Sequence, residues 1–101
     1  MIKFQRITTK DATLYNYMEQ LMTASFPSEE YRPLEELRNY TDTKTHFYCN
    51  IILHHDTPVG FITYWDFGHF YYVEHFAIDP SLRNGGHGKN VLNHLCQQLN
   101  K

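Results

Sequence analysis

The 101-residue sequence has only two cysteines, little net charge and no long hydrophobic run. A membrane span needs about 20 consecutive apolar residues, so no membrane partner is expected. The net charge of −2 argues against nucleic acid as the main partner, because such proteins need a basic surface. Cys49 and Cys96 lack metal-binding or redox spacing. Both thiols are expected to be buried, and no signal peptide is visible, so a reducing cytoplasm is the expected location.

The seven histidines are not spaced as metal ligands. His54 and His55 are neighbours in a segment expected to be a strand, where adjacent side chains point to opposite faces. It is difficult for one ion to bind both. His87 and His94 lack the i, i+4 spacing of a helical zinc pair. No metal is therefore expected.

Apolar residues are frequent enough to form a core, with 42% hydrophobic and 16% aromatic residues. One domain over residues 1–101 is expected. Apolar spacing predicts strands at 2–7, 46–54, 59–67 and 70–78, and helices at 11–25, 33–40 and after the glycines at 85–88. Short turns join the last three strands and predict an antiparallel meander. The fold class is α+β, with a sheet of about four strands, two N-terminal helices and one C-terminal helix.

The turn between the last strand and the last helix opens that helix on glycines, at Gly85, Gly86 and Gly88. A helix begins with backbone N–H groups that lack partners, and no residue here caps them well. Arg83 and Lys89 add positive charge at the positive end of the helix dipole. A bound phosphate would satisfy the N–H groups and the cations together. The alternative is a glycine-rich turn that needs positive φ angles.

Two common phosphate motifs fit this turn less well, because Asn90 and Val91 stand where those motifs need a hydroxyl and a third glycine. The arrangement Arg83-x-x-Gly86-x-Gly88, set between a strand and a helix, instead resembles the (Gln/Arg)-x-x-Gly-x-(Gly/Ala) signature of the GNAT superfamily of N-acetyltransferases. The preceding segment 74–80 also resembles that family's strand. The order of elements matches the family fold from its first strand through its third main helix.

The resemblance implies acetyl-CoA as the cofactor. In the family, backbone N–H groups of the signature hold the pyrophosphate of coenzyme A. The corresponding positions here are Arg83, Asn84, Gly85, Gly86, His87, Gly88 and Lys89. Backbone groups of the preceding strand, near Phe76, Ala77 and Ile78, would bind the pantetheine arm and polarise the acetyl carbonyl.

Acetyl transfer to an amine needs the amine to lose its proton, and amines with a pKa near ~10 are mostly charged at neutral pH. Glu74, on the strand before the signature, is the candidate base. Tyr72 is a second candidate, because some members of the family place the base there. Counting by twos puts Glu74 on one face with Tyr72, Phe76 and Ile78, and His75 on the other. In the alternative, Glu74 pairs with a cation or faces solvent.

Glu29 and Glu30 lie in the charged segment 28–32 between the first two helices. In the family this region borders the acceptor groove, so the two acidic residues would suit a cationic amine. The alternative is a solvated loop. The resemblance as a whole implies an enzyme that moves an acetyl group from acetyl-CoA to a small-molecule or peptide amine by direct attack. Alternatives are a non-catalytic acyl-CoA-binding module, an inactive truncated transferase and a different nucleotide-phosphate binder.

The family fold continues with further strands and a fourth helix, whereas this sequence stops at Lys101. The C-terminal part of the fold is therefore expected to be missing, and the strand at 70–78 is expected to be a sheet edge. This strand is rich in aromatic residues, with Glu74 as its only formally charged residue. Exposed apolar edges favour pairing with another chain. Self-association through this edge is therefore expected.

Overall fold

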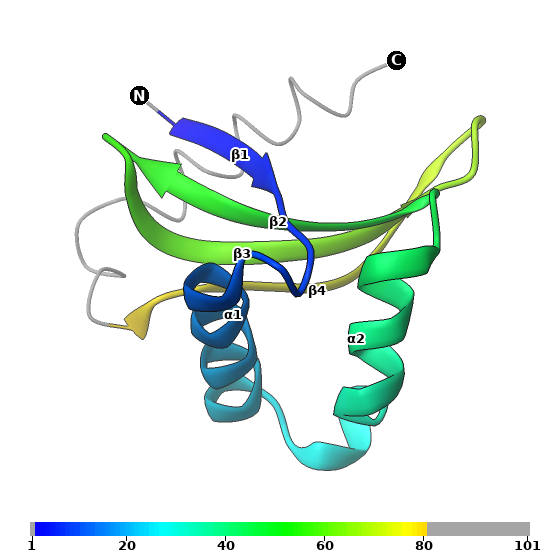
Figure 1. The fold of residues 1–101 in the computed structure, drawn as a ribbon, viewed down its shortest axis with the longest axis horizontal. Coiled ribbons are helices and arrows are strands. Elements are labelled where there is room, and N and C mark those ends of the chain that lie inside the picture. The colour runs from blue at the N-terminus through cyan, green and yellow to red at the C-terminus, as the bar shows by residue number, and fades with distance from the viewer. Residues whose placement is uncertain (1, 81–101) are drawn as a thin grey trace.

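The computed structural model describes residues 2–80, and Figure 1 shows a curved sheet with two helices on one of its faces. The elements are β1 (Ile2–Arg6), α1 (Ala12–Ser25), a short 3₁₀ helix η1 (Ser28–Glu30), α2 (Leu34–Thr43), β2 (Phe47–His54), β3 (Thr57–Asp66) and β4 (Tyr71–Ile78). The strands pair antiparallel in the order β1-β2-β3-β4. The α+β class and the meander are confirmed. The expected C-terminal helix and the signature at 83–89 lie outside the described residues.

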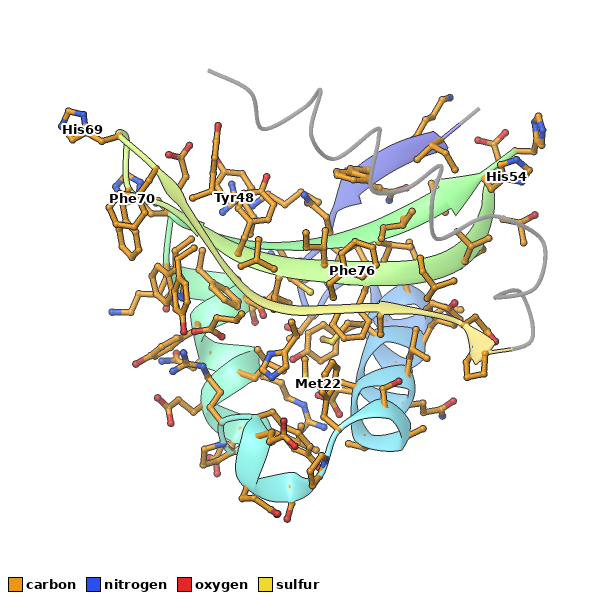
Figure 2. All side chains as sticks on the ribbon, turned by 180° about the vertical axis from the view of Figure 1, so that it is seen from behind. Met22, Tyr48, His54, His69, Phe70 and Phe76 are labelled. Carbon is orange, nitrogen blue, oxygen red and sulfur yellow. The ribbon has the colours of Figure 1, made fainter. Side chains whose placement is uncertain are left out.

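An apolar layer covers each face of the sheet. On the helical face, Met18 and Met22 of α1 and Leu37 of α2 pack against the inward side chains of the strands, and each is at most 2% exposed. Burying one such side chain stabilises the fold by about 1.5–3 kcal/mol, so this layer fixes the helices on the sheet. The opposite face carries a smaller cluster of Ile52, Val59, Ile62, Tyr64 and Ile78, with Phe76 packed against it. Figure 2 shows Met22 and Phe76 on different sides of β4.

The second helix is longer than the sequence pattern predicts. It ends at Thr43 rather than near Tyr40. The hydroxyls of Thr41 and Thr43 donate to the carbonyl oxygens of Leu37 and Asn39, at 2.8 and 2.7 Å. These bonds run back four residues along the helix and satisfy both hydroxyl groups. The segment that contains them was expected to be a connecting loop.

A β-bulge interrupts β4 opposite β3. Thr63 pairs with His75, but Tyr64 pairs with Val73, so Glu74 is an extra residue between two paired ones. A bulge turns two successive side chains toward the same side of a sheet. Glu74 and His75 accordingly both contact the helical side, through Arg32 and through Phe26.

The bulge overturns one expectation about these side chains. Glu74 does not share a face with Phe76 and Ile78, which lie in the opposite apolar layer. His75 does not lie opposite Glu74 either. Counting by twos fails here because it assumes an uninterrupted strand.

Candidate active site

A groove forms where the β4 bulge faces the segment between α1 and α2. Its volume is about 400 Å³, and its lining residues are Glu29, Glu30, Tyr31, Arg32, Tyr72, Glu74 and His75. These residues come from two segments, 29–32 and 72–75, that are far apart in the chain. The groove thus brings together the two predicted acceptor residues, Glu29 and Glu30, with both candidate bases, Tyr72 and Glu74.

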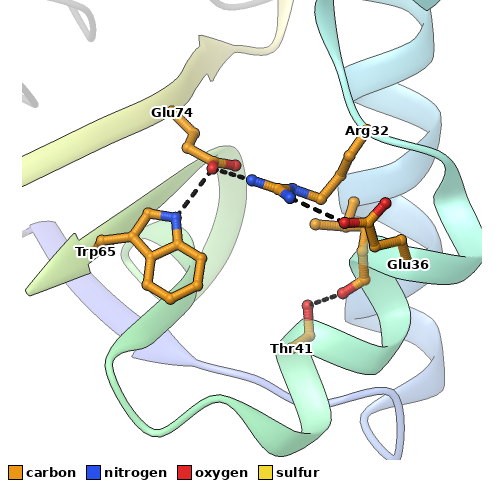
Figure 3. Close-up of polar contacts among 6 residues, drawn as sticks. Arg32, Glu36, Thr41, Trp65 and Glu74 are labelled. Atoms are coloured by element: carbon orange, nitrogen blue, oxygen red, sulfur yellow. Dashed lines mark hydrogen bonds and ion pairs between the residues drawn. The ribbon is translucent and has the colours of Figure 1, made fainter.

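Glu74 is largely enclosed, with a side chain that is 11% exposed, whereas Glu29 and Glu30 are exposed. Oε1 of Glu74 accepts a hydrogen bond from the Trp65 indole Nε1 at 2.9 Å. The same oxygen forms an ion pair with Nη2 of Arg32 (Figure 3). Both contacts end on Oε1, so neither uses the second oxygen, Oε2.

Arg32 connects β4 to α2. Its Nη1 donates to Oε1 of Glu36 at 3.2 Å, and its guanidinium lies over the Tyr40 ring, 4.6 Å from the ring centroid. Partial burial lowers the pKa of Arg32, but hydrogen bonds and charge from Glu74 and Glu36 outweigh burial and raise that pKa above its ordinary value. Arg32 is therefore a permanent cation between two carboxylates.

His75 ties the bulge to η1. Its Nε2 lies 2.7 Å from the carbonyl oxygen of Glu30. A carbonyl only accepts, so Nε2 carries the proton and donates. The imidazole also meets the Phe26 ring edge-on, with centroids 4.9 Å apart. His75 is thus both hydrogen-bonded to η1 and packed against Phe26.

Tyr72 stands at the rim of the groove. It is 55% exposed and pairs with Trp65 across the sheet. Glu29 and Glu30 are exposed on η1. The deep part of the groove thus holds Glu74, while the residues nearer to solvent are tyrosine and glutamate. This arrangement can attract a cation to the rim and present one carboxylate at the bottom.

Two residues of the site were missed by reasoning from the sequence. Arg32 was noted only as part of a charged segment, and Trp65 was not considered. One general signal was available for Trp65, because a buried indole N–H usually has a hydrogen-bond partner. Nothing in the spacing indicated that its partner would be nine residues away at Glu74.

The described part of β4 is compatible with the predicted arm of coenzyme A. One edge of β4 pairs with β3, and no strand within residues 2–80 pairs with its other edge. An extended amide-containing chain can bind along such an edge through backbone hydrogen bonds. Ala77 and Ile78 are 5% and 6% exposed and anchor this end of the strand by packing. The predicted pyrophosphate-binding residues lie outside the described part of the chain.

Within residues 2–80, no group of three His, Cys, Asp or Glu side chains could hold a metal ion. In the same part of the chain, every helix is too short or too polar to cross a membrane. The cytoplasmic location stays a prediction.

Comparison with known proteins identifies relatives. The profile of the acetyltransferase (GNAT) family matches residues 12–101. A solved structure from Bacteroides thetaiotaomicron, described as an acetyltransferase from the GNAT family, is 60% identical, with a TM-score of 0.96. The alignment covers 98% of this chain and 56% of that one. The chain thus spans little more than half the length of this relative.

Two further structures are of an aminoglycoside acetyltransferase from an uncultured soil metagenomic sample, one with sisomicin and one with trehalose. They are 20% and 19% identical, with TM-scores of 0.66 and 0.65. Each alignment covers 97% of this chain and 69% of the other. At this identity they show a shared fold. The comparison with curated proteins gave no significant match.

Proposed function

The chain belongs to the acetyltransferase (GNAT) family, and from this premise we propose that it transfers an acetyl group from acetyl-CoA to an amine by direct attack. The observation that carries the proposal is the acidic groove at the β4 bulge. It places a well-enclosed carboxylate on the strand that leads to the predicted pyrophosphate signature. Small-molecule amines are the acceptor class we propose, in keeping with the aminoglycoside acetyltransferases that share the fold.

When bound, acetyl-CoA would supply the activated acetyl group, whose C–S bond would break as the C–N bond to the amine forms, and coenzyme A would leave as its thiolate. The residues that would hold acetyl-CoA are the backbone of Phe76, Ala77 and Ile78 for the arm and residues 83–89 for the pyrophosphate. The side chains that line the groove would carry out the rest of the chemistry. They bind the amine, orient it toward β4 and take its proton.

Glu74 is the proposed base. A primary amine is mostly protonated at neutral pH, and a carboxylate in hydrogen-bond reach can accept its proton. In the free protein the side chains of Trp65 and Arg32 both bind Oε1 of Glu74 and hold its carboxylate in the groove. Glu29 and Glu30 at the rim raise the local concentration of cationic acceptors. Tyr72, on the same side of the groove, is the second candidate for the proton acceptor.

Ligand-induced stabilisation tests the cofactor part of the proposal. At one hundred times its dissociation constant, acetyl-CoA should stabilise the protein by about 2.7 kcal/mol, while ATP at equal concentration should not. Gly86→Asp and Gly88→Asp should each abolish the shift, because they add a side chain and a negative charge where the pyrophosphate would bind.

Gly68→Asp is the matched control for this test. It adds the same side chain in the β3–β4 turn, where nothing lies within 4 Å of the added Cβ. This variant should keep the full acetyl-CoA shift. Equal shifts in the wild type and in both signature variants would contradict the proposed cofactor site. Stabilisation without transfer to any amine would favour a non-catalytic acyl-CoA-binding module.

A further inference from the structure

We propose that Arg32 is the resident counter-ion of Glu74, and that a cationic amine binds the groove by taking the place of Arg32 on this carboxylate while Arg32 stays on Glu36. The inference rests on the proposed function for the role of Glu74 as the amine's partner. It adds the form in which the acceptor enters, as an ammonium ion, and the residue that sets the strength of its binding.

The geometry around Arg32 allows it to leave Glu74 without losing its other contacts. Nη2 faces Glu74, whereas Nη1 faces Glu36 on α2. The Tyr40 ring supports the face of the guanidinium. Glu36 and Tyr40 both belong to α2, directly after Arg32 in the chain. The bond to Glu74 is therefore the one contact of this set that connects Arg32 to the sheet.

Glu74 needs a cation beside it both in the free protein and when an amine is bound in the groove. Its side chain is 11% exposed, and a carboxylate enclosed to this degree is costly without a partner. Arg32 supplies that partner in the free protein. An ammonium ion carries the same charge and also donates hydrogen bonds, so it can replace the guanidinium without leaving the carboxylate unpaired.

The charge balance of the groove favours this exchange. Its lining contains three carboxylates, Glu29, Glu30 and Glu74, against the single guanidinium of Arg32. An incoming cation therefore meets an excess of negative charge. After the exchange Arg32 is paired with Glu36, and the amine is paired with Glu74 and lies near the two rim glutamates.

Trp65 reports on the exchange directly. It is the only tryptophan of the chain, and its indole N–H donates to the carboxylate oxygen that Arg32 also contacts. A change of the cation at Glu74 changes the electrostatic surroundings of the indole. Its fluorescence therefore gives a binding signal that requires neither cofactor nor turnover.

The experiment titrates the full chain with 1,4-diaminobutane at constant ionic strength while Trp65 emission is recorded. The neutral 1,4-butanediol serves as the ligand control. Arg32→Gln should bind the diamine about tenfold more tightly than the wild type, because it removes a competitor worth one charge-assisted hydrogen bond. Arg32→Lys keeps a cation and should bind much as the wild type does.

A second variant should bind the diamine more weakly than the wild type does. Glu36→Gln removes the carboxylate on which Arg32 would stay, so Arg32 should hold Glu74 more strongly and the diamine should bind severalfold more weakly. Glu35→Gln is its matched control, since it removes one charge from the same turn of α2 at an exposed position. Arg38→Gln, which breaks the ion pair with Glu19 outside the groove, should leave the affinity unchanged.

These outcomes separate this inference from the proposed function. Tighter binding in Arg32→Gln together with weaker binding in Glu36→Gln supports the exchange, whether or not acetyl transfer is detected. Unchanged or weaker binding in Arg32→Gln overturns it, even if the protein is an active acetyltransferase. If Arg32→Gln does not fold, as circular dichroism would show, the decision passes to Glu36→Gln: binding equal to that of Glu35→Gln overturns the exchange.

Discussion

Gly60 allows β3 and β4 to approach each other closely at the end of β4. It pairs with Ile78, and an ideal Cβ on Gly60 would overlap the carbonyl oxygen of Ala77. The same Cβ would lie 3.0 Å from Cδ1 and 3.1 Å from Cα of Ile78. Most of these atoms are backbone, so relief of the overlap requires the two strands to separate. Gly60→Ala should therefore destabilise the fold rather than fill a space.

The expected cost follows from overpacking. Extra atoms in a well-packed core cost typically about 1–3 kcal/mol, and each kcal/mol lowers the melting temperature of a domain of this size by roughly 4–8 °C. Thermal unfolding followed by circular dichroism measures the shift. The cost should increase from Gly60→Ala to Gly60→Val, because the added volume is larger.

Gly68→Asn is the control for this series. Gly68 has a φ of +88°, and no atom lies within 4 Å of a Cβ added there. A side chain at this φ is strained even without a clash, but asparagine adopts left-handed angles more readily than most residues, so this variant should lose less stability than Gly60→Val. A Gly60→Ala protein that melts at the wild-type temperature would refute the close approach of β4 to β3.

Three further predictions concern other parts of the molecule. Burial raises the pKa of Cys49 to about 12, so this thiol should resist iodoacetamide at pH 8 until the protein unfolds, as peptide mass mapping would show. Burial, then the charge and hydrogen bond of Asp79, raise the pKa of Tyr17 to about 12 from 10.0. Because the unfolded state loses this proton first, stability should fall as the pH rises above about 10, less steeply in Tyr17→Phe; identical slopes would contradict this. The β4 edge, where Tyr72 and Val73 are 55% and 39% exposed, should produce concentration-dependent dimers in sedimentation, and a compact monomer at all concentrations would refute self-association.

Much of the fold could be predicted because its signals are local. The apolar stripe of α1, including Met18 and Met22, repeats at helical spacing, and the alternation along β2 predicts a strand. The bulge at Glu74 has no such local signal. Nothing in the sequence between Tyr71 and Ile78 marks the position where the pairing shifts, because the register depends on contacts with β3.

The site, like the bulge, depends partly on contacts between distant parts of the chain. Glu74, Tyr72, Glu29 and Glu30 were selected through the family resemblance, and they do line one groove. The contact of Arg32 with Glu74 joins residues 42 positions apart, and no pattern within a segment encodes such a contact. The alternative reading of Glu74 as the partner of a cation also describes an observed feature, since Arg32 pairs with it. In the proposed exchange Glu74 has both roles, because it pairs with Arg32 in the free protein and with the amine in the complex.

The most direct test of the central claim is the rate at which free coenzyme A thiol forms from acetyl-CoA in the presence of an amine panel, compared between wild type and Glu74→Gln. Glu19→Gln is the matched control, because Glu19 also pairs with an arginine but lies outside the groove. We predict transfer by the wild type and by Glu19→Gln, and a loss of about 10²-fold or more in Glu74→Gln at neutral pH. Equal rates for Glu74→Gln and wild type across the pH range would contradict the role of Glu74 as the base for acetyl transfer.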